Sequence, residues 1–465
     1  MTASPQRFDL AIVGAGPAGL AAGALAGELG LSCVLLDEQP EPGGQIYRAL
    51  GRMAASAPDR LEIFGASYRQ GLSLLDGLRR AGLDYRPGTL VWQIDPPGQL
   101  WTLRDSRCQE IEAARVLLCG GALERPVPIP GWTLPGVLGA GAAQILLKGA
   151  GLVPDGPTVL LGNGPLLFLL LAQYQAAGFE PAAVLLTDGF GDRLRAARHL
   201  PGFLSSGALP EAIKLLAAVR RTGARILHRV RDVAILGETA VEAVSFLSKG
   251  RRETIPAKLV CLHEGVVPNT QMTRLIGCAH IWDPRQQAFR PRLDPWGNTS
   301  IEAIQVAGDG GGISGAQAAE LTGRIAVLEA ARALGRLSEE ERNRRSAADR
   351  RKLARLLRGR PFIDALYGPR LMRRPATGET IVCRCEEVTA EQIRQAVREG
   401  CQGPNQAKSF TRCGMGSCQG RFCGLSVSQI IAAERGVSMD DVGYYRIRPP
   451  IKPIELGALA ETVEA

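Results

Sequence analysis

A glycine-rich turn near the N-terminus constrains the fold of this 465-residue chain more than any other feature. An apolar run typical of a buried strand, residues 8–13, leads into Gly14-Ala15-Gly16-Pro17-Ala18-Gly19 and then into an Ala/Leu-rich helix. In this pattern the first glycine makes the turn, the second lets a pyrophosphate approach, and the third lets the helix pack on the strand. The N-terminus of the helix offers N–H groups and a positive dipole to the phosphates. The sequence therefore predicts a Rossmann-type, dinucleotide-binding α/β domain.

An acidic pair follows at the expected distance. A second apolar run, residues 32–36, ends in Asp37-Glu38, and Asp37 lies eighteen positions beyond Gly19. In dinucleotide-binding domains an acidic residue about 20 positions after the glycines binds the adenosine ribose. We expect Asp37 to hold the ribose, with Glu38 as the competing choice.

Two further glycine segments indicate which dinucleotide binds. Gly43-Gly44-Gln45 follows the acidic pair, and Gly308-Asp309 follows the strand-like run 299–306. Both resemble the flavin signatures of the two-dinucleotide-domain flavoproteins, which include thioredoxin and glutathione reductases. The resemblance implies FAD, with Asp309 accepting a hydrogen bond from the ribityl chain and the next helix facing the isoalloxazine.

A second Rossmann-type opening occurs at residues 158–167, but Leu167 occupies the position of the third glycine. A leucine there would hold the helix away from the strand and spoil the phosphate seat. We therefore regard NAD(P) binding in this inserted domain as doubtful, and expect the domain to persist as a scaffold or an interface. Residues 265–269 resemble the usual return to the FAD domain.

Paired cysteines near the C-terminus predict a metal centre. Cys383 and Cys385 are followed about thirty residues later by Cys413 and Cys418. In an extended segment residues i and i+2 point to one face, so the first two thiols are expected to ligate together. Thr389-Ala390-Glu391-Gln392 is a capping box that predicts a helix over 391–399, which would fold the second pair back onto the first. Four thiolates suit a [2Fe–2S] cluster or structural zinc.

The same motif resembles the bacterioferritin-associated-ferredoxin-like [2Fe–2S] domain found in multi-subunit flavin dehydrogenases, which implies an iron–sulfur cluster. Gly414 and Gly416 are expected to bend the backbone around it and to aim N–H groups at its sulfurs. Cys423 is an alternative fourth ligand to Cys418, and Cys401 is expected only to pack.

These segments predict an α/β flavoprotein with two dinucleotide-binding domains and a small α-helical [2Fe–2S] domain. The expected boundaries follow in chain order. They are 1–150 for the first part of the FAD domain, 151–270 for the inserted NAD(P)-like domain, 271–330 for the second part of the FAD domain, 331–375 for a basic helical linker, and 376–465 for the cluster domain and C-terminal tail.

The net charge of +9 lies in one place. Residues 331–375 contain fourteen Lys/Arg and five Asp/Glu, a net of +9, and the remainder of the chain is neutral. The segment is typical of a solvated amphipathic helix or of a docking surface for a partner chain. Nucleic acid is not expected as a partner, because no stacking aromatic residues alternate with the basic ones.

Targeting signals do not stand out in the sequence. The N-terminus lacks the layout of a signal peptide, and no apolar run approaches the ~20 residues that a transmembrane helix needs. The eleven cysteines are too unevenly spaced for a disulfide framework, and a thiol-ligated cluster favours a reducing compartment. We expect a cytoplasmic protein, with peripheral contact to the inner membrane through an electron acceptor as an open alternative.

Catalytic residues remain unassigned. The chain has no Cys-x-x-Cys pair beside the flavin motifs, and its four histidines are isolated. Cys119 and His263 lie in segments that approach the cofactor, but no acid/base set for oxidising a substrate is visible.

The whole chain resembles the α subunit of heteromeric amino-acid dehydrogenases, a group with opine oxidase and the D-hydroxyproline and proline dehydrogenases and, more distantly, cyanide synthase and sarcosine oxidase. The resemblance extends to Asp37–Gln45, Pro130-Gly131-Trp132, Pro135-Gly136-Val137, Asp309 and the cysteines. It implies a β flavoprotein subunit that oxidises a C–N bond, a possible small γ subunit, and electron relay through FAD and [2Fe–2S] to a downstream acceptor.

Three alternatives are kept. One is a self-contained NAD(P)H-dependent reductase, which needs the Leu167 site to bind nucleotide. The second is a glycine-oxidising equivalent of cyanide synthase. The third is an assembly subunit that holds its cofactors only for structure.

Overall fold

Strand β1 (Gln6–Val13) lies at the centre of the first sheet in the computed structural model, which describes residues 6–464. It pairs in parallel with β2 (Cys33–Asp37) on one side and with β6 (Arg107–Leu118) on the other. The order β3-β2-β1-β6-β19 is that of a Rossmann-type sheet, with β3 spanning Asp84–Pro87 and β19 spanning Ile304–Val306. The strand that precedes Gly308 is thus brought into the same sheet as β1 from nearly three hundred residues away.

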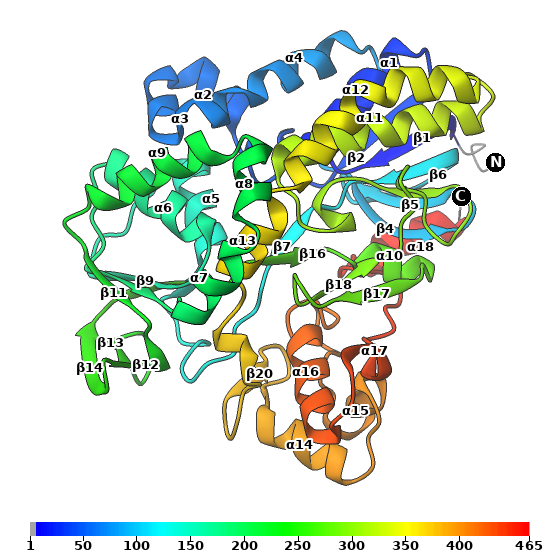
Figure 1. Cartoon of the computed structure of the whole chain (residues 1–465). Helices are drawn as coiled ribbons and strands as arrows, with labels where there is room; N and C mark the ends of the chain where they lie inside the picture. The colour runs from blue at the N-terminus through cyan, green and yellow to red at the C-terminus, as the bar shows by residue number, and fades with distance from the viewer. Residues whose placement is uncertain (1–5, 465) are drawn as a thin grey trace.

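Helices α1 (Pro17–Glu28) and α11 (Ala316–Ala333) pack against one another on one face of this sheet (Figure 1). The first half of β6 also pairs antiparallel with β5 (Gln99–Arg104), which pairs with β4 (Leu90–Asp95). Between β2 and β3 the chain forms a helical excursion. Its elements are α2 (Leu50–Ser56), η1 (Pro58–Arg60), α3 (Leu61–Arg69) and α4 (Gly71–Arg80).

The inserted domain has its own parallel sheet in the order β11-β10-β9-β15-β8. Its strands are β8 (Val137–Gly139), β9 (Thr158–Gly162), β10 (Ala183–Leu186), β11 (Arg225–His228) and β15 (Leu259–His263). Because β8 pairs with β15, the sheet of this domain begins before the expected boundary at residue 151. An antiparallel sheet is formed by β12 (Arg231–Leu236), β13 (Ala243–Ser248) and β14 (Arg251–Pro256).

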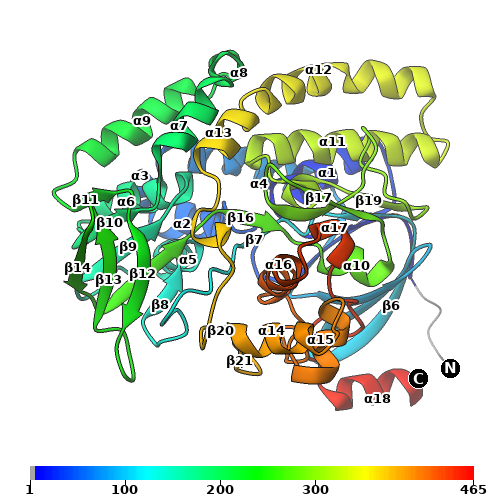
Figure 2. The same cartoon turned by 60° about the horizontal axis from the view of Figure 1, so that its bottom comes forward.

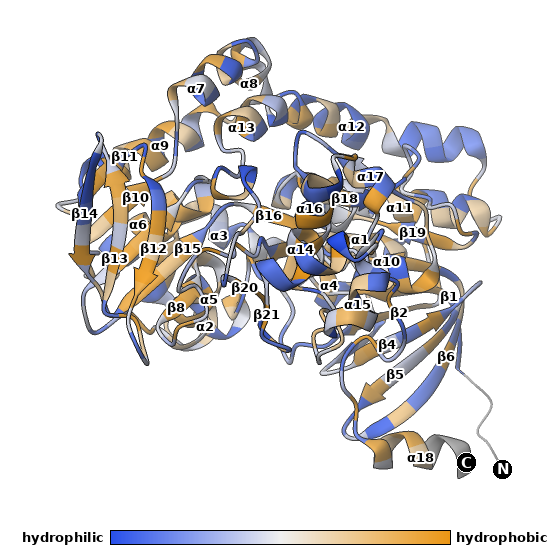
Figure 3. Ribbon diagram, turned by 90° about the horizontal axis from the view of Figure 1, so that it is seen from below, coloured by the Kyte–Doolittle hydropathy of each residue, from blue (hydrophilic) through white to orange (hydrophobic). Residues whose placement is uncertain are grey.

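Five helices belong to the inserted domain. They are α5 (Ala140–Ala150), α6 (Pro165–Ala176), α7 (Phe190–Ala197), α8 (Leu200–Ser206) and α9 (Leu209–Arg220). No single described helix is long and apolar enough to cross a membrane, although α8 and α9, bent at 101°, meet the length and composition test together. Figure 3 shows the contrast between the apolar strand β10 and the hydrophilic outer strand β14.

The chain returns to the FAD domain through β16 (Val266–Pro268), which pairs with β7 (Ala122–Glu124). The elements that follow are α10 (Gln271–Ile276), the hairpin β17 (His280–Asp283) and β18 (Ala288–Pro291), the turn η2 (Gly308–Gly311), and the helices α11, α12 (Glu339–Leu357) and α13 (Arg360–Leu366).

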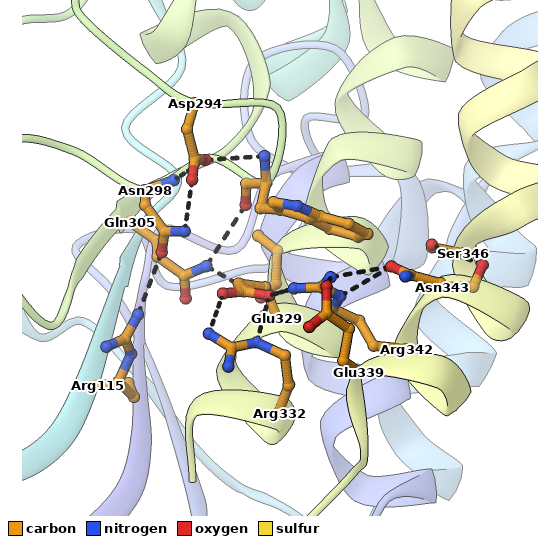
Figure 4. A network of polar contacts seen from close by, with 12 residues as sticks. Arg115, Asp294, Asn298, Gln305, Glu329, Arg332, Glu339, Arg342, Asn343 and Ser346 are labelled. Atoms are coloured by element: carbon orange, nitrogen blue, oxygen red, sulfur yellow. Dashed lines mark hydrogen bonds and ion pairs between the residues drawn. The ribbon is translucent and has the colours of Figure 1, made fainter. Parts of the chain in front are cut away.

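One face of the basic segment is packed against the FAD domain. Arg342 of α12 is nearly buried and forms an ion pair of 2.5 Å with Glu329 of α11, to which Arg332 also binds (Figure 4). The ring of Trp296 lies 3.8 Å from the Arg342 guanidinium and 4.5 Å from that of Arg350. The first part of the segment is therefore packed against the FAD domain, and its later part, α13, packs on α7 and α8 of the inserted domain.

The C-terminal domain lies at the bottom of Figure 1, below the two Rossmann-type domains, and Figure 2 shows it turned forward, in front of their junction. The short η3 (Leu371–Arg373) precedes it and packs on the inserted domain. The C-terminal domain itself comprises β20 (Ile381–Cys383), β21 (Val388–Thr389), α14 (Ala390–Arg398), α15 (Pro404–Thr411), α16 (Gly424–Arg435) and α17 (Met439–Val442). The Thr389–Gln392 capping box is present and begins α14, so the predicted helix is confirmed to within one residue. The tail returns to the FAD domain, where α18 (Leu456–Glu464) packs on β6.

Candidate functional site

Three glycine segments that are distant in the sequence meet at the N-terminus of α1. A Cβ atom at Gly44 would lie 2.9 Å from the Cα of Gly16, and one at Gly308 would lie 3.1 Å from the Cβ of Ala18. No described side chain caps the first turn of α1, so its N–H groups are available to an anion. This convergence is the cradle that a dinucleotide pyrophosphate requires, and the residues present fit FAD.

The structure distinguishes the two candidate ribose acids. Asp37 is buried below the turn, where its carboxylate accepts hydrogen bonds from the N–H groups of Ala15 (2.5 Å) and Gln39 (2.7 Å). Burial raises the pKa of Asp37 above its usual range, and these bonds oppose the rise. Glu38 is exposed and forms an ion pair with Lys452 of the C-terminal tail. Asp37 is thus held at the glycine turn, whereas Glu38 is already engaged elsewhere.

Asp309 shapes the turn before α11. One of its carboxylate oxygens accepts hydrogen bonds from the N–H groups of Ser314 (2.8 Å) and Gly315 (2.9 Å). The other oxygen has no hydrogen-bond partner among the described residues, which leaves it for the ribityl hydroxyl that the resemblance implies.

Lys148 of α5 anchors the second glycine segment. It is 3% exposed, and its ammonium donates to the carbonyls of Gln45 (3.3 Å) and Ile46 (2.8 Å) and to the Gln144 side chain (2.9 Å). The segment that would approach the flavin ring is therefore attached to the first helix of the inserted domain. The sequence did not single this residue out, since an isolated lysine in a helix carries no motif.

Lys148 is expected to make stability depend on pH. Burial, followed by the nearby Arg48 guanidinium, lowers the pKa of Lys148 from 10.5 to about 7. Between these values the unfolded chain binds more protons than the folded one, so the free energy of unfolding rises with pH by at most ~1.4 kcal/mol per unit. Urea unfolding at pH 7, 8 and 9 should show this slope in the wild type and a smaller one in Lys148→Met. The exposed-lysine control Lys214→Met should keep the wild-type slope, and equal slopes in all three proteins would contradict the assignment.

In the inserted domain, protein side chains fill the place where the phosphates of a dinucleotide would bind. Leu167, which takes the place of the third glycine, is fully buried. The His263 ring lies over the turn, where a Cβ at Gly164 would be 2.9 Å from its Nε2 atom. His263 Nδ1 lies 2.7 Å from Glu124, whose other oxygen accepts a hydrogen bond from the Gly141 N–H. These side chains lie where phosphates would approach.

The segment after α13 closes the same edge of the sheet. Glu264 is completely buried and accepts hydrogen bonds from Thr187 and from the N–H groups of Arg370 and Leu371. Arg370 also binds the buried Asp192 (3.0 Å), as does Arg373 (2.5 Å). A Cβ at Gly189 would collide with the Arg370 guanidinium. The ligand edge of this Rossmann-type sheet is thus occupied by residues 370–373 of the chain itself.

Three thiols converge in the C-terminal domain. The Sγ atoms of Cys383, Cys413 and Cys423 lie within 4.8 Å of one another, and all three side chains are buried. Cys383 ends β20, Cys413 follows α15, and Cys423 precedes α16. Cys423, which the sequence offered only as an alternative fourth ligand, therefore belongs to the tight group.

Cys385 and Cys418 form a second pair, in which the Cys385 thiol helps to raise the pKa of Cys418. Cys385 is exposed and Cys418 is half-buried. The extended segment expected to carry both Cys383 and Cys385 ends at Cys383, where β20 stops and the chain turns. Five sulfurs are therefore present for the four ligand positions of a [2Fe–2S] cluster.

The environment of Cys383 favours a thiolate. Hydrogen bonds from the thiols of Cys413 and Cys423, and then from the N–H groups of Gly414 and Glu386, lower the pKa of Cys383 to about 2. The same contacts raise the pKa of Cys413 to about 12 and also raise that of Cys423. A buried set of sulfurs that already shares protons fits a metal centre, whose binding would release the remaining protons.

Gly414 has the backbone bend that the sequence predicted, with a φ of +83°, and both glycines also leave room for a neighbouring side chain. Gly414 does aim its N–H at Cys383, but a side chain there would also collide with Tyr445, the Cβ lying 2.5 Å from its ring. A Cβ at Gly416 would collide with Cys385. Both positions need glycine because another side chain occupies the space.

The cysteine group is tied to both Rossmann-type domains, since Trp132 packs in the core of the inserted domain and Arg274 belongs to α10 of the FAD domain. The Trp132 indole donates to the carbonyl of Ile381 (2.6 Å), two residues before Cys383. The Arg274 guanidinium lies 4.9 Å from the ring of Phe289 and 4.2 Å from that of Tyr444, which joins α10 to the segment after α17. The two candidate cofactor sites thus belong to one packed unit.

Two segments of the chain match known families. Residues 377–462 match the family described as "Sarcosine oxidase A3 domain", and residues 12–52 match the "NAD(P)-binding Rossmann-like domain". The first contains all five clustered cysteines, and the second contains the glycine turn and Asp37.

Full-length similarities extend these matches. The A subunit of opine oxidase from Agrobacterium tumefaciens (strain Ach5) is 44% identical, with 97% of this chain and 91% of that protein aligned. The HcnB subunit of hydrogen cyanide synthase from Pseudomonas aeruginosa is 33% identical over 96% of this chain and 97% of that one. The crystal structure of L-proline dehydrogenase from P. horikoshii superposes with a TM-score of 0.70 at 19% identity, covering 98% of this chain and 80% of that chain, and so shares the fold.

Proposed function

Because the chain belongs to the family of the opine oxidase A subunits, we propose that it is the FAD- and [2Fe–2S]-carrying component of a heteromeric dehydrogenase. The complex would oxidise the C–N bond of an opine, an amino acid or an imino acid of the proline or hydroxyproline type. This chain would relay the electrons through FAD and the cluster.

The observation that carries the proposal is the pairing of two sites in one packed unit. The glycine cradle at Gly16, Gly44 and Gly308 fits a flavin dinucleotide, and the thiol group at Cys383 fits a cluster. When bound, a flavin takes up two electrons as a pair and an iron–sulfur cluster passes single electrons, so together they convert one mode of transfer into the other. The chain's own residues bind, orient and shield these groups.

Oxidation of the substrate is assigned to the partner subunit. In the described part of the chain, the histidines nearest the candidate sites have structural partners: His263 is beside Glu124, and His280 lies 2.9 Å from the Thr273 hydroxyl. Burial lowers the pKa of His280 to about 3, which removes it as a base near neutral pH. An organisation in several chains agrees with the names of the relatives, each of which designates one subunit of an enzyme.

The rival function, an NAD(P)H-dependent reductase, is disfavoured by the filled seat of the inserted domain. Leu167 and His263 occupy the space next to the turn that a nicotinamide dinucleotide would use, and Arg370 fills the space at Gly189, after the next strand. The cyanide synthase equivalent is retained as an outcome of the test, because HcnB is also similar over nearly the whole chain.

The test is anaerobic reduction of the purified chain, first by itself and then with its partner subunit. We expect the visible spectrum to contain flavin and [2Fe–2S] bands that neither NADH, NADPH nor any amine substrate bleaches in the isolated chain. Once the partner has been added, an opine or imino acid should bleach both sets of bands.

The other outcomes are equally definite. Rapid bleaching by NADH alone would establish the reductase and overturn the proposal. Bleaching by glycine in the complex would assign the cyanide synthase chemistry. If no substrate bleached the flavin and [2Fe–2S] bands at the rate of turnover, the cofactors would take no part in catalysis and the chain would have a role in assembly only.

A further inference from the structure

Tyr445 approaches the thiol group without being a ligand. We propose that its hydroxyl donates a hydrogen bond to the cysteine sulfurs of the metal centre and thereby raises the reduction potential of the cluster. The inference rests on the [2Fe–2S] cluster of the proposed function and adds a residue that sets its electronic properties.

The position of the hydroxyl is defined by distance and burial. Tyr445 is 1% exposed, and its hydroxyl oxygen lies 3.9 Å from the Sγ atom of Cys423. The same hydroxyl also lowers the pKa of the Cys413 thiol. One phenol therefore faces two of the three thiols in the tight group.

The aromatic ring of Tyr445 is held in place by close packing against two glycines. A Cβ at Gly414 would lie 2.5 Å from the Tyr445 Cζ atom, and one at Gly420 would collide with the Cδ2 atom of the same ring. These two glycines flank Cys418 in the loop that carries the cysteines, so the loop is folded around the phenol. The Lys408 ammonium lies 4.6 Å from the ring centroid.

The backbone of Tyr445 is fixed independently of the cysteines. The Asn405 side chain donates to the carbonyl of Tyr444 (3.1 Å) and accepts from the N–H of Arg446 (2.8 Å). Ser428 of α16 donates to the carbonyl of Gly443 (2.8 Å). Hydrogen bonds outside the cysteine group therefore fix the backbone that carries the Tyr445 hydroxyl, and its position does not depend on the sulfur contacts.

The direction of the effect follows from which group carries the proton. A free thiol can donate to the phenol oxygen, but a thiolate bound to iron has no proton, so only the Tyr445 O–H can then donate. A donor near sulfur stabilises negative charge, and a reduced cluster carries one more negative charge than an oxidised one. The bond is therefore stronger in the reduced state, which raises the potential. The nearby Lys408 cation acts in the same direction.

The variant Tyr445→Phe removes the hydroxyl and keeps the ring between Gly414 and Gly420. The matched control is Tyr444→Phe, since the neighbouring hydroxyl donates to the Gly420 carbonyl (3.3 Å) and not to sulfur. The measurement is the midpoint potential of the cluster in the full-length, FAD-loaded protein, followed by its EPR signal during a redox titration. Iron content and the visible spectrum check that each variant holds an intact cluster.

We expect the potential to fall in Tyr445→Phe and to stay at the wild-type value in Tyr444→Phe. A Tyr445→Phe protein with an intact cluster and an unchanged potential would overturn the proposal, as would an equal shift in both variants, which would indicate general packing. An exchangeable proton coupled to the reduced cluster, seen by ENDOR in the wild type and lost only in Tyr445→Phe, gives a second readout. A wild-type protein without iron would instead refute the cluster itself.

Discussion

Serine at Cys383 or Cys413 is expected to abolish the cluster. Both sulfurs belong to the tight group and to the ligand set expected from the sequence, so both arguments agree on them. A serine oxygen is a poor replacement for a soft thiolate ligand of iron, and loss of one ligand should remove most of the iron and the visible bands attributed to the cluster. Iron analysis and visible absorption of the purified protein measure this directly.

The fifth cysteine provides a sharper comparison. Since the Cys423 sulfur lies within the tight group and Cys418 pairs with Cys385 outside it, we expect Cys423→Ser to lose the cluster and Cys418→Ser to retain most of it. The reverse result would restore the ligand set Cys383, Cys385, Cys413 and Cys418. Cys401→Ser is the matched control, because its buried thiol donates to the Gly403 carbonyl (3.1 Å) and lies outside both groups.

Gly19→Ala is expected to eliminate FAD binding and to destabilise the whole domain. A Cβ at Gly19 would overlap the Gly14 carbonyl oxygen, which belongs to the turn itself. The helix would have to move away from β1, and overpacking of this kind costs ~1–3 kcal/mol or more because backbone atoms cannot repack as side chains do. Flavin absorbance after gel filtration and the thermal midpoint are the measurements.

The control for this variant is Gly149→Ala in α5. Its Cβ would have no heavy atom within 4 Å, and alanine is favoured over glycine in a helix by roughly 0.5–1 kcal/mol. Gly149→Ala should therefore keep its flavin and its stability. If Gly19→Ala also kept its flavin and its stability, the inference that α1 packs too closely on the glycine turn for a side chain at this position would be contradicted.

Motifs whose structure depends only on neighbouring residues were predicted correctly. The capping box at Thr389 begins α14, and the strand, turn and helix around Gly14 are in place, since each depends on hydrogen bonds and backbone angles within a few residues. The extended segment expected to reach Cys385 is shorter than the same kind of reasoning assumed. The rule that i and i+2 share a face holds only while the strand continues, and β20 ends at Cys383.

The expected start of the inserted domain at residue 151 shows a second limit of prediction from sequence. The segment Val137–Gly139 is short and has no pattern of its own, and its membership in the inserted sheet follows only from its pairing with β15. The basic segment likewise has the pattern of a solvated helix, because its sequence does not disclose that Arg342 is paired with Glu329 beside the ring of Trp296.

The sequence by itself determined the two-domain flavoprotein fold, the dinucleotide cradle and the presence of a thiol centre, because these depend on short motifs whose geometry is built into the backbone. Only the tertiary structure decided that Cys423 joins the tight group, that Tyr445 faces its sulfurs, and that Arg370 closes the inserted domain. These contacts join segments that are separated along the chain. Their distances are set by how whole domains pack, and no local rule of spacing or periodicity contains that information.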